Sequence, residues 1–254
     1  MTAPRPRRLL AMDAAGASCS VALWDGERVA VRRFAAMARG QSESLVPMIA
    51  EVMAEWGGGF ADLDALAVTT GPGGFTGVRI GLATARGLAL ARGLPLIGVT
   101  SFEVAAAAAS EEERAGRRVL AVIDSKRNEL FMQIFNSDLA PLGPPVEVAL
   151  EDLAAALPPG PLVVTGDAAV RAVAALAAAG CQDARAAAAA GPADAALLAA
   201  RAALRDPAAD GAEAVQPVYL RPPDVTPPKQ PNGAPPKQPN GAPAPAVRKG
   251  GPRP

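Results

Sequence analysis

The chain has 254 residues, of which 50% are hydrophobic and 20% are charged, so it is long enough for one large or two small globular domains. It contains no histidine, which excludes a histidine base, a histidine-ligated metal and histidine-dependent nucleophiles. Basic and acidic residues are equal at 25 each, but both ends are basic, and residues 9–221 carry 17 basic and 24 acidic residues. An acidic body matches nucleic acid poorly, so we expect such contact only through the ends or a partner.

The two cysteines and the N-terminus indicate the cellular compartment. Cys19 and Cys181 form no CxxC motif and are typical of small apolar residues in a reducing compartment. Arg7 and Arg8 precede a stretch that resembles a signal peptide, but Asp13 interrupts its apolar run. No run reaches the length of a membrane span. We therefore expect a cytoplasmic protein without membrane contact.

The first half of the chain predicts three short strands, a helix, a strand, a second helix and a last strand. Asp25-Gly26 indicates a hairpin between the second and third strands. Apolar residues recur at spacings of three and four along the first helix, which Gly57 ends. The predicted elements are residues 8–13, 18–24, 28–34, 42–56, 65–70, 76–92 and 95–99. An antiparallel meander that leads into parallel strand–helix–strand units indicates an α/β lobe.

The second half predicts another lobe with alternating helices and strands. We expect helices at 102–114, 151–157, 168–179 and 194–204, and strands at 118–124, 129–136 and 162–165. Residues 222–254 contain 12 of the 26 prolines and a tandem PPKQPNGA repeat, which is typical of a disordered tail. The predicted domains are a basic extension (1–7), a first lobe (8–100), a second lobe (101–221) whose last helix could pack on the first, and the tail (222–254).

Two loops are candidates for binding phosphate. The stretch TTGPGGFTGVR at 69–79 follows a strand and opens a helix, where free amides and the helix dipole attract anions, and Thr76 could cap that helix. It lacks the Gly-Lys-Ser/Thr of a P-loop, so a tight turn without a ligand is an equal alternative. Asp13 ends the first strand before Gly16 and Ser18, although an aspartate there is also a common turn former. The candidate loop residues are Asp13, Gly16, Ser18, Gly71, Gly73, Gly74 and Thr76.

Small residues form stripes along the second helix. Each glycine weakens an isolated helix by about 1 kcal/mol relative to alanine, so another element must approach closely in compensation. Gly77, Gly81, Ala85 and Ala89 form one row, and Ala83, Gly87 and Ala91 form a neighbouring row. The close neighbour could be intramolecular, or the helices could form a pair that binds another subunit. The predicted interface comprises Leu45, Met48, Ile49, Val52, Met53, Trp56, Gly77, Gly81, Ala85 and Ala89.

Several segments together resemble one family. DAAGASCSVALWDG, GQSESLVPMI, TTGPGGFTGVRIGLATARGLALARGLPLIGVTSFE, VIDSKRNELF and PVYLR occur in the order seen in TsaB (YeaZ) proteins, which take part in tRNA threonylcarbamoyladenosine biosynthesis. The resemblance covers about residues 8–221, and its most specific part is GPGGFTGVRIGLATARGLA. It implies an α/β fold of the two-lobed actin-like (ASKHA), ribonuclease-H-like kind.

The resemblance also implies a role without catalysis. The expected function is that of a scaffold subunit that supports the paralogous transferase TsaD in modifying the adenosine next to the tRNA anticodon. TsaD would bind the helix pair as a heterodimer, the ATPase TsaE would join, and tRNA would be contacted only through the complex. ATP and metal would belong to the partner subunits, so we expect no catalytic residue, cofactor or metal on this chain. When the chain is alone, the same helix pair could form a homodimer.

The sequence departs from the family pattern near both loops. The histidine common before Leu45 is absent, Gly74 stands where serine is common, and Ala14 stands where threonine or serine is common. These departures argue against handling of phosphate or metal. Two alternatives remain open: an actin-like ATPase or kinase that acts alone and holds Mg-nucleotide with Asp13 and the 71–77 loop, and a homodimeric structural protein. A TsaD-like enzyme with a two-histidine metal site is excluded because the chain has no histidine.

Overall fold

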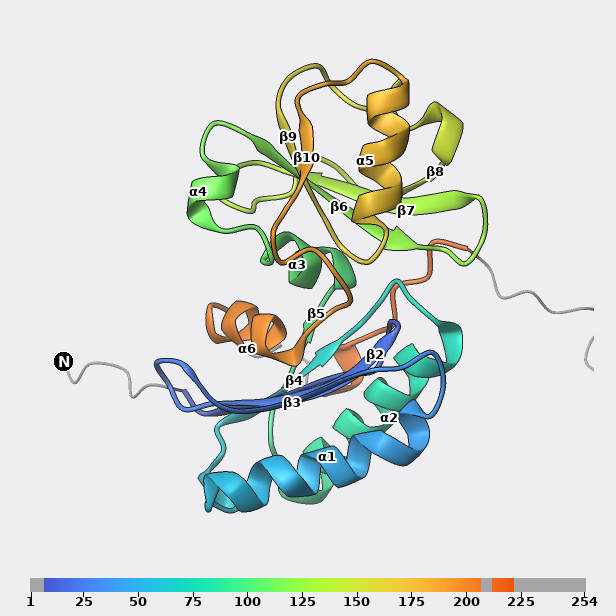
Figure 1. Cartoon of the computed structure of the whole chain (residues 1–254). Helices are drawn as coiled ribbons and strands as arrows, with labels where there is room; N and C mark the ends of the chain where they lie inside the picture. The colour runs from blue at the N-terminus through green and yellow to red at the C-terminus, as the bar shows by residue number, and fades with distance from the viewer. Residues whose placement is uncertain (1–6, 207–211, 222–254) are drawn as a thin grey trace, which may run out of the picture. The chain divides into compact units, whose positions relative to one another are not determined.

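The computed structural model describes residues 7–206 and 212–221 (Figure 1). Its contacts divide the chain into Met1–Pro222 and Pro223–Pro254, and the second unit lies outside the described residues. The predicted disorder of the tail therefore stays a prediction, and so do the predicted domain boundaries. Among the described residues no helix is long and apolar enough to cross a membrane.

The N-terminal part forms a five-stranded sheet of order β3-β2-β1-β4-β5. β1 pairs antiparallel with β2 and β2 with β3, whereas β1 pairs parallel with β4 and β4 with β5. This is the predicted meander followed by parallel units. Its elements are β1 (Leu9–Asp13), β2 (Ser18–Trp24), β3 (Val29–Ala36), α1 (Gln41–Trp56), η1 (Phe60–Asp62), β4 (Ala65–Thr69), α2 (Phe75–Arg92) and β5 (Leu96–Val99).

The second part repeats the same arrangement in a sheet of order β10-β9-β6-β7-β8. β6 pairs antiparallel with β7 and β7 with β8, whereas β6 pairs parallel with β9 and β9 with β10. Each first strand, β1 or β6, thus lies in the middle of its sheet. The strands are β6 (Arg118–Asp124), β7 (Glu129–Phe135), β8 (Val146–Ala149), β9 (Leu162–Thr165) and β10 (Ala184–Ala186). The helices are α3 (Ser101–Ala106), α4 (Glu111–Arg114), η2 (Leu150–Asp152), α5 (Ala169–Ala178), α6 (Ala195–Ala203) and η3 (Ala212–Ala214).

Both faces of the first sheet are covered, because alternate residues of its buried strands point to opposite sides. Leu10 and Met12 belong to the core under α1 and α2, whereas Leu9 and Ala11 pack with residues of α6 on the other face. Figure 1 shows α1 and α2 on one side of this sheet and α6 on the other. The helix pair therefore has one face against its own sheet and one face toward solvent.

Two predicted helices of the second part were wrong, and two strands were not predicted. The helix predicted at 102–114 is two helices, because Ser110 and Glu113 form a capping box that starts α4 afresh. The helix predicted at 151–157 is the short η2 followed by turns. The prediction also missed β8 and β10, which are edge strands of four and three residues, too short to show a clear alternation.

Candidate functional site

A cleft of about 680 Å³ lies where the loops after β1 and β4 meet the ends of β6 and β9. Of the predicted loop residues, Gly16, Gly73, Gly74 and Thr76 line this cleft. Its opposite wall comes from the second sheet, with Ile123, Asp124, Lys126 and Asp167. The cleft thus lies between the C-terminal ends of β1 and β4 in the first sheet and those of β6 and β9 in the second.

The two candidate phosphate loops pack directly on one another. The amide of Gly74 donates a 2.7 Å hydrogen bond to the carbonyl of Ala15. A Cβ atom at Gly73 would lie 2.2 Å from the Ala15 oxygen, and a Cβ atom at Gly77 would lie 2.0 Å from the Ala14 oxygen. These two glycines are therefore needed because the first loop's backbone approaches so closely.

Asp13 is buried beneath these loops and does not line the cleft. One carboxylate oxygen, Oδ1, accepts a long hydrogen bond (3.4 Å) from the Ala15 amide, and Oδ2 has no hydrogen-bond partner. Burial raises the pKa of Asp13 to about 6, and the charges of Asp194 and Asp167 act in the same direction. A carboxyl group in this environment favours its neutral form more than an exposed one does.

Three of the predicted loop residues have structural roles that the sequence did not indicate. Ser18 lies in β2, where its hydroxyl donates to the carbonyl of Ala193 (2.9 Å), away from the cleft. Thr76 does not cap α2, because it is the second residue of the helix and Gly74 occupies the N-cap position. Gly71 has a φ of +95° and lies against the Val218 carbonyl, 3.1 Å from where its Cβ would be.

The acidic residues of the second wall were not predicted from the sequence. Asp167 accepts a hydrogen bond from the Asp124 amide (2.8 Å), and burial raises the pKa of the Asp167 carboxyl. Burial alone would raise the pKa of Asp124 too, but hydrogen bonds from the Lys126 ammonium (3.0 Å) and amide (2.9 Å) lower it overall. One signal could have found Asp124: it ends the first strand of the second sheet, as Asp13 ends the first strand of the first.

The helix-pair residues predicted to bind a partner mostly fill the core of their own lobe. Met48 and Trp56 are half-buried against that core, and Gly77 is half-buried against Ala14. The periodicity marked the face that packs on the sheet, so most of these side chains are buried within their own lobe. The seven fully buried residues are Leu45, Ile49, Val52, Met53, Gly81, Ala85 and Ala89.

The neighbouring row of small residues is the one that faces outward. Ala83, Gly87 and Ala91 are exposed, and a Cβ atom at Gly87 would meet nothing within 4 Å. On α1, which contacts α2, Val46 (57% exposed) and Ala50 are also exposed. We call these five residues the outer face. These five side chains carry no charge, and the largest of them is valine.

The repeated strand order and the cleft at the ends of β1, β4, β6 and β9 define the two-lobed actin-like class of fold. A family model described as TsaD, tRNA N6-adenosine threonylcarbamoyltransferase, matches residues 35–225. Together with the relatives that follow, this match shows that the chain belongs to that family and, within it, to the TsaB (YeaZ) proteins.

Two named relatives are tRNA threonylcarbamoyladenosine biosynthesis proteins TsaB. The chain is 40% identical over 131 residues to the Escherichia coli protein, covering 52% of this chain and 56% of the relative. It is 41% identical over 124 residues to the Haemophilus influenzae protein, covering 48% and 51%. The matched stretches therefore span about half of these relatives. An uncharacterized protein of Mycobacterium tuberculosis H37Rv is 33% identical over 202 residues, covering 80% of this chain and 82% of that protein.

Two solved structures from Pseudomonas aeruginosa resemble the two-lobed part. One is described as an uncharacterized protein with similarity to peptidase YeaZ, with a TM-score of 0.69 and 27% identity over 85% of this chain and all of that one. The other, YeaZ, has a TM-score of 0.68 and 26% identity over 84% of this chain and all of that one. The predicted fold class is thereby confirmed.

Proposed function

We propose that this protein is the non-catalytic TsaB-type subunit that supports TsaD in forming N6-threonylcarbamoyladenosine in tRNA. The similarity to two proteins of that name supports the pathway. The contact between the Gly74 amide and the Ala15 carbonyl supports the non-catalytic role. In this proposal TsaE and the metal and ATP sites belong to the rest of the complex, which works in the cytoplasm.

The cleft fits Mg-nucleotide poorly. A phosphate in the glycine-rich loop would need free amides, but the Gly74 amide is bonded to the first loop, and the Ala14 and Ala15 carbonyl oxygens face Gly77 and Gly73. Within residues 7–206 and 212–221, no three His, Cys, Asp or Glu residues are grouped so that they could hold a metal ion. We therefore expect neither ATP binding nor turnover by the isolated chain.

The outer face of α1 and α2 is the proposed contact surface for TsaD. Its exposed valine, alanines and glycine can be buried without leaving a charge unpaired, and Gly87 leaves room for close approach of another helix. The proposed surface lies on the same helix pair as the interface predicted from the sequence, but it consists of exposed residues in place of the buried ones. Contact with tRNA would be indirect, because residues 9–221 are acidic.

Co-purification and complementation test the proposal. The chain should co-purify with TsaD from the same genome, and its gene should restore threonylcarbamoyladenosine in tRNA, measured by mass spectrometry, when the host TsaB is depleted. Ala83→Arg with Gly87→Arg should abolish both, because two charges would be buried in the contact. Ala174→Arg, on an exposed position of α5, is the matched control and should change neither.

The alternatives predict different results in two further measurements. Calorimetric titration with ATP and Mg²⁺ should give no heat, whereas binding that Asp13→Ala removes would support the lone ATPase or kinase. Sedimentation of the chain with and without TsaD tests the other alternative. A homodimeric structural protein stays a homodimer when TsaD is added, whereas a TsaB-type subunit leaves its homodimer and binds TsaD. A chain that never associates with TsaD would overturn the proposed function.

A further inference from the structure

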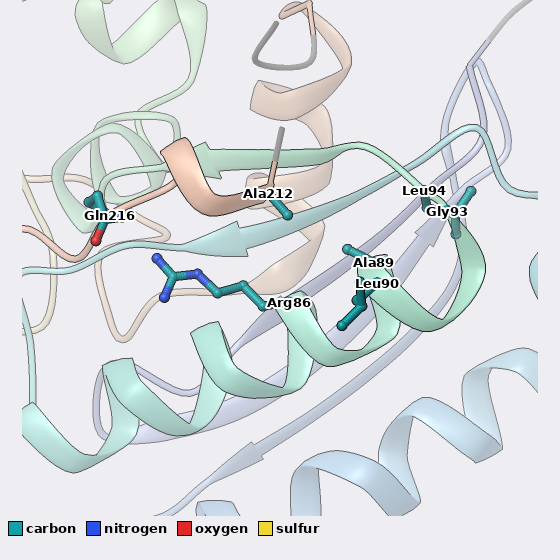
Figure 2. Close-up of a pocket in the computed structure, with 7 residues that line it drawn as sticks. All are labelled: Arg86, Ala89, Leu90, Gly93, Leu94, Ala212 and Gln216. Carbon is teal, nitrogen blue, oxygen red and sulfur yellow. The ribbon is translucent and has the colours of Figure 1, made fainter. Parts of the chain in front are cut away.

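A second hollow lies along the flank of α2. It has a volume of about 640 Å³ and is formed between the C-terminal half of α2 and the segment from Ala212 to Gln216 (Figure 2). Ala89, Leu90, Leu94 and Ala212 give it an apolar lining, and Leu90 at its rim is 87% exposed. Nothing in the proposed role of the outer face or of the cleft accounts for this pocket.

Among the lining residues that the structure describes, Arg86 is the one that carries a charge. One guanidinium nitrogen, Nη2, donates to the Val215 carbonyl (2.5 Å), while Nε is buried without a hydrogen-bond partner. In Figure 2 the guanidinium extends from α2 toward the 212–216 segment. The other lining residues that the structure describes are apolar or, at Gln216, uncharged, and a guanidinium N–H without a partner in such a hollow is suited to bind an anion.

We propose that the pocket receives an acidic residue next to a bulky apolar residue, both presented by the protein that covers the outer face. This inference rests on the proposed function, since it names a second part of the surface that contacts TsaD. The carboxylate would pair with Arg86, and the apolar side chain would pack on Leu90 and Leu94.

Charge and position favour this occupant over the chain's own ends. The N-terminal residues carry Arg5, and residues 225–254 carry five basic residues and no acidic one, so Arg86 would repel both segments. Leu90 stands on the same helix as Gly87, one turn further along, so a partner on the outer face reaches the pocket rim.

The affinity of the full-length chain for TsaD, measured by calorimetry, tests the pocket. Arg86→Gln should weaken binding about tenfold or more, because the partner's carboxylate loses its charged donor. Arg92→Gln is the matched control on the same helix, since Arg92 is exposed and lies over the Phe60 ring (5.3 Å) outside the pocket. Wild-type affinity should fall with added salt more steeply than that of Arg86→Gln.

A second pair of variants leaves Arg86 in place and so keeps its hydrogen bond to the Val215 carbonyl. Leu90 is exposed, so Leu90→Glu and Leu90→Gln should both fold, and the two side chains have nearly the same shape. Glu at this position would pair with Arg86 and compete with the partner, so it should weaken binding at least about fivefold more than Gln.

The outcomes separate the two proposals. If the wild-type chain does not bind TsaD, the proposed function fails and this inference fails with it. If it binds and the two Leu90 variants are equally weak, or Arg86→Gln binds as Arg92→Gln does, the pocket assignment is overturned while the proposed function stands. If Arg86→Gln changes only self-association in sedimentation, the occupant is a second copy of this chain and the assignment to TsaD is wrong.

Discussion

The amide of Gly74 donates a 2.7 Å hydrogen bond to the carbonyl of Ala15, and this bond joins the glycine-rich turn to the loop after β1. Both loops therefore satisfy polar backbone groups with each other. The same contact explains why Gly73 and Gly77 have no side chain, since their Cβ atoms would overlap the carbonyl oxygens of Ala15 and Ala14. A loop that would bind an anion in another protein serves here to hold the first lobe together.

Alanine substitutions at two glycines of α2 should have opposite effects on stability. Gly77→Ala should lower the free energy of unfolding by about 3 kcal/mol or more, because the new Cβ would lie 2.0 Å from the Ala14 oxygen. Gly87→Ala should raise it by about 0.5–1 kcal/mol, because the site is open and alanine favours the helix. Urea denaturation of both variants measures the difference. Equal changes in the free energy of unfolding for the two variants would contradict the close contact of Gly77 with the loop after β1.

Asp13 should make stability depend on pH in the acid range. Its pKa rises from the ordinary value of 3.8 to about 6 on folding, so its ionisation costs nothing below pH 3.8 and progressively destabilises the fold as pH rises through 6. Asp13→Asn removes this cost and should raise the free energy of unfolding at pH 7 by about 2 kcal/mol.

The comparison of Asp13→Asn with the wild type should show no gain near pH 3.5 and a growing gain up to about pH 7. Thermal melts across this range measure it. Asp183→Asn, at an exposed position, is the control and should track the wild type throughout. A gain for Asp13→Asn that is independent of pH would contradict the ionisation argument.

Leucine at two neighbouring positions of α2 should distinguish its inner face from its outer face. Gly81 is buried, and a Cβ atom there would lie 3.5 Å from Val68 Cγ2. Gly81→Leu should therefore unfold the lobe or lower the free energy of unfolding by about 3 kcal/mol. Ala83→Leu lies on the outer face and should leave the melt within about 0.5 kcal/mol of the wild type. A normal melt for Gly81→Leu would show that this row does not pack on the sheet.

Truncation should show where the folded part ends. The Val218 amide donates to the Thr70 carbonyl (2.9 Å), Tyr219 accepts from Arg79 (3.2 Å), and Arg221 pairs with Glu129 and Glu147. A chain ending at Arg221 keeps these contacts, so its melt and its TsaD binding should match the full chain. A chain ending at Gln216 loses them and should be less stable by about 2 kcal/mol. Equal melts for the two truncated chains would contradict this.

The sequence predicted the first lobe more accurately than the second. Asp25-Gly26, the apolar spacing of α1 and the buried strand β4 are local signals, and all three elements formed where they were expected. In the second lobe, alanine-rich stretches carry little contrast between a buried and an exposed face. The helix predicted at 151–157 failed for this reason, whereas β10 was missed because its three residues are too few to show an alternation.

The sequence by itself determined the fold class, the family and the absence of histidine chemistry, because these depend on composition and on contiguous motifs. It also located the two stripes of small residues on α2, but periodicity does not say which stripe faces the protein interior. Only the tertiary structure decided that Gly81 packs on the sheet and Gly87 faces solvent. The contact of Gly74 with Ala15 and the burial of Asp13 likewise required the fold, since they bring together loops about 60 residues apart through the parallel pairing of β1 with β4.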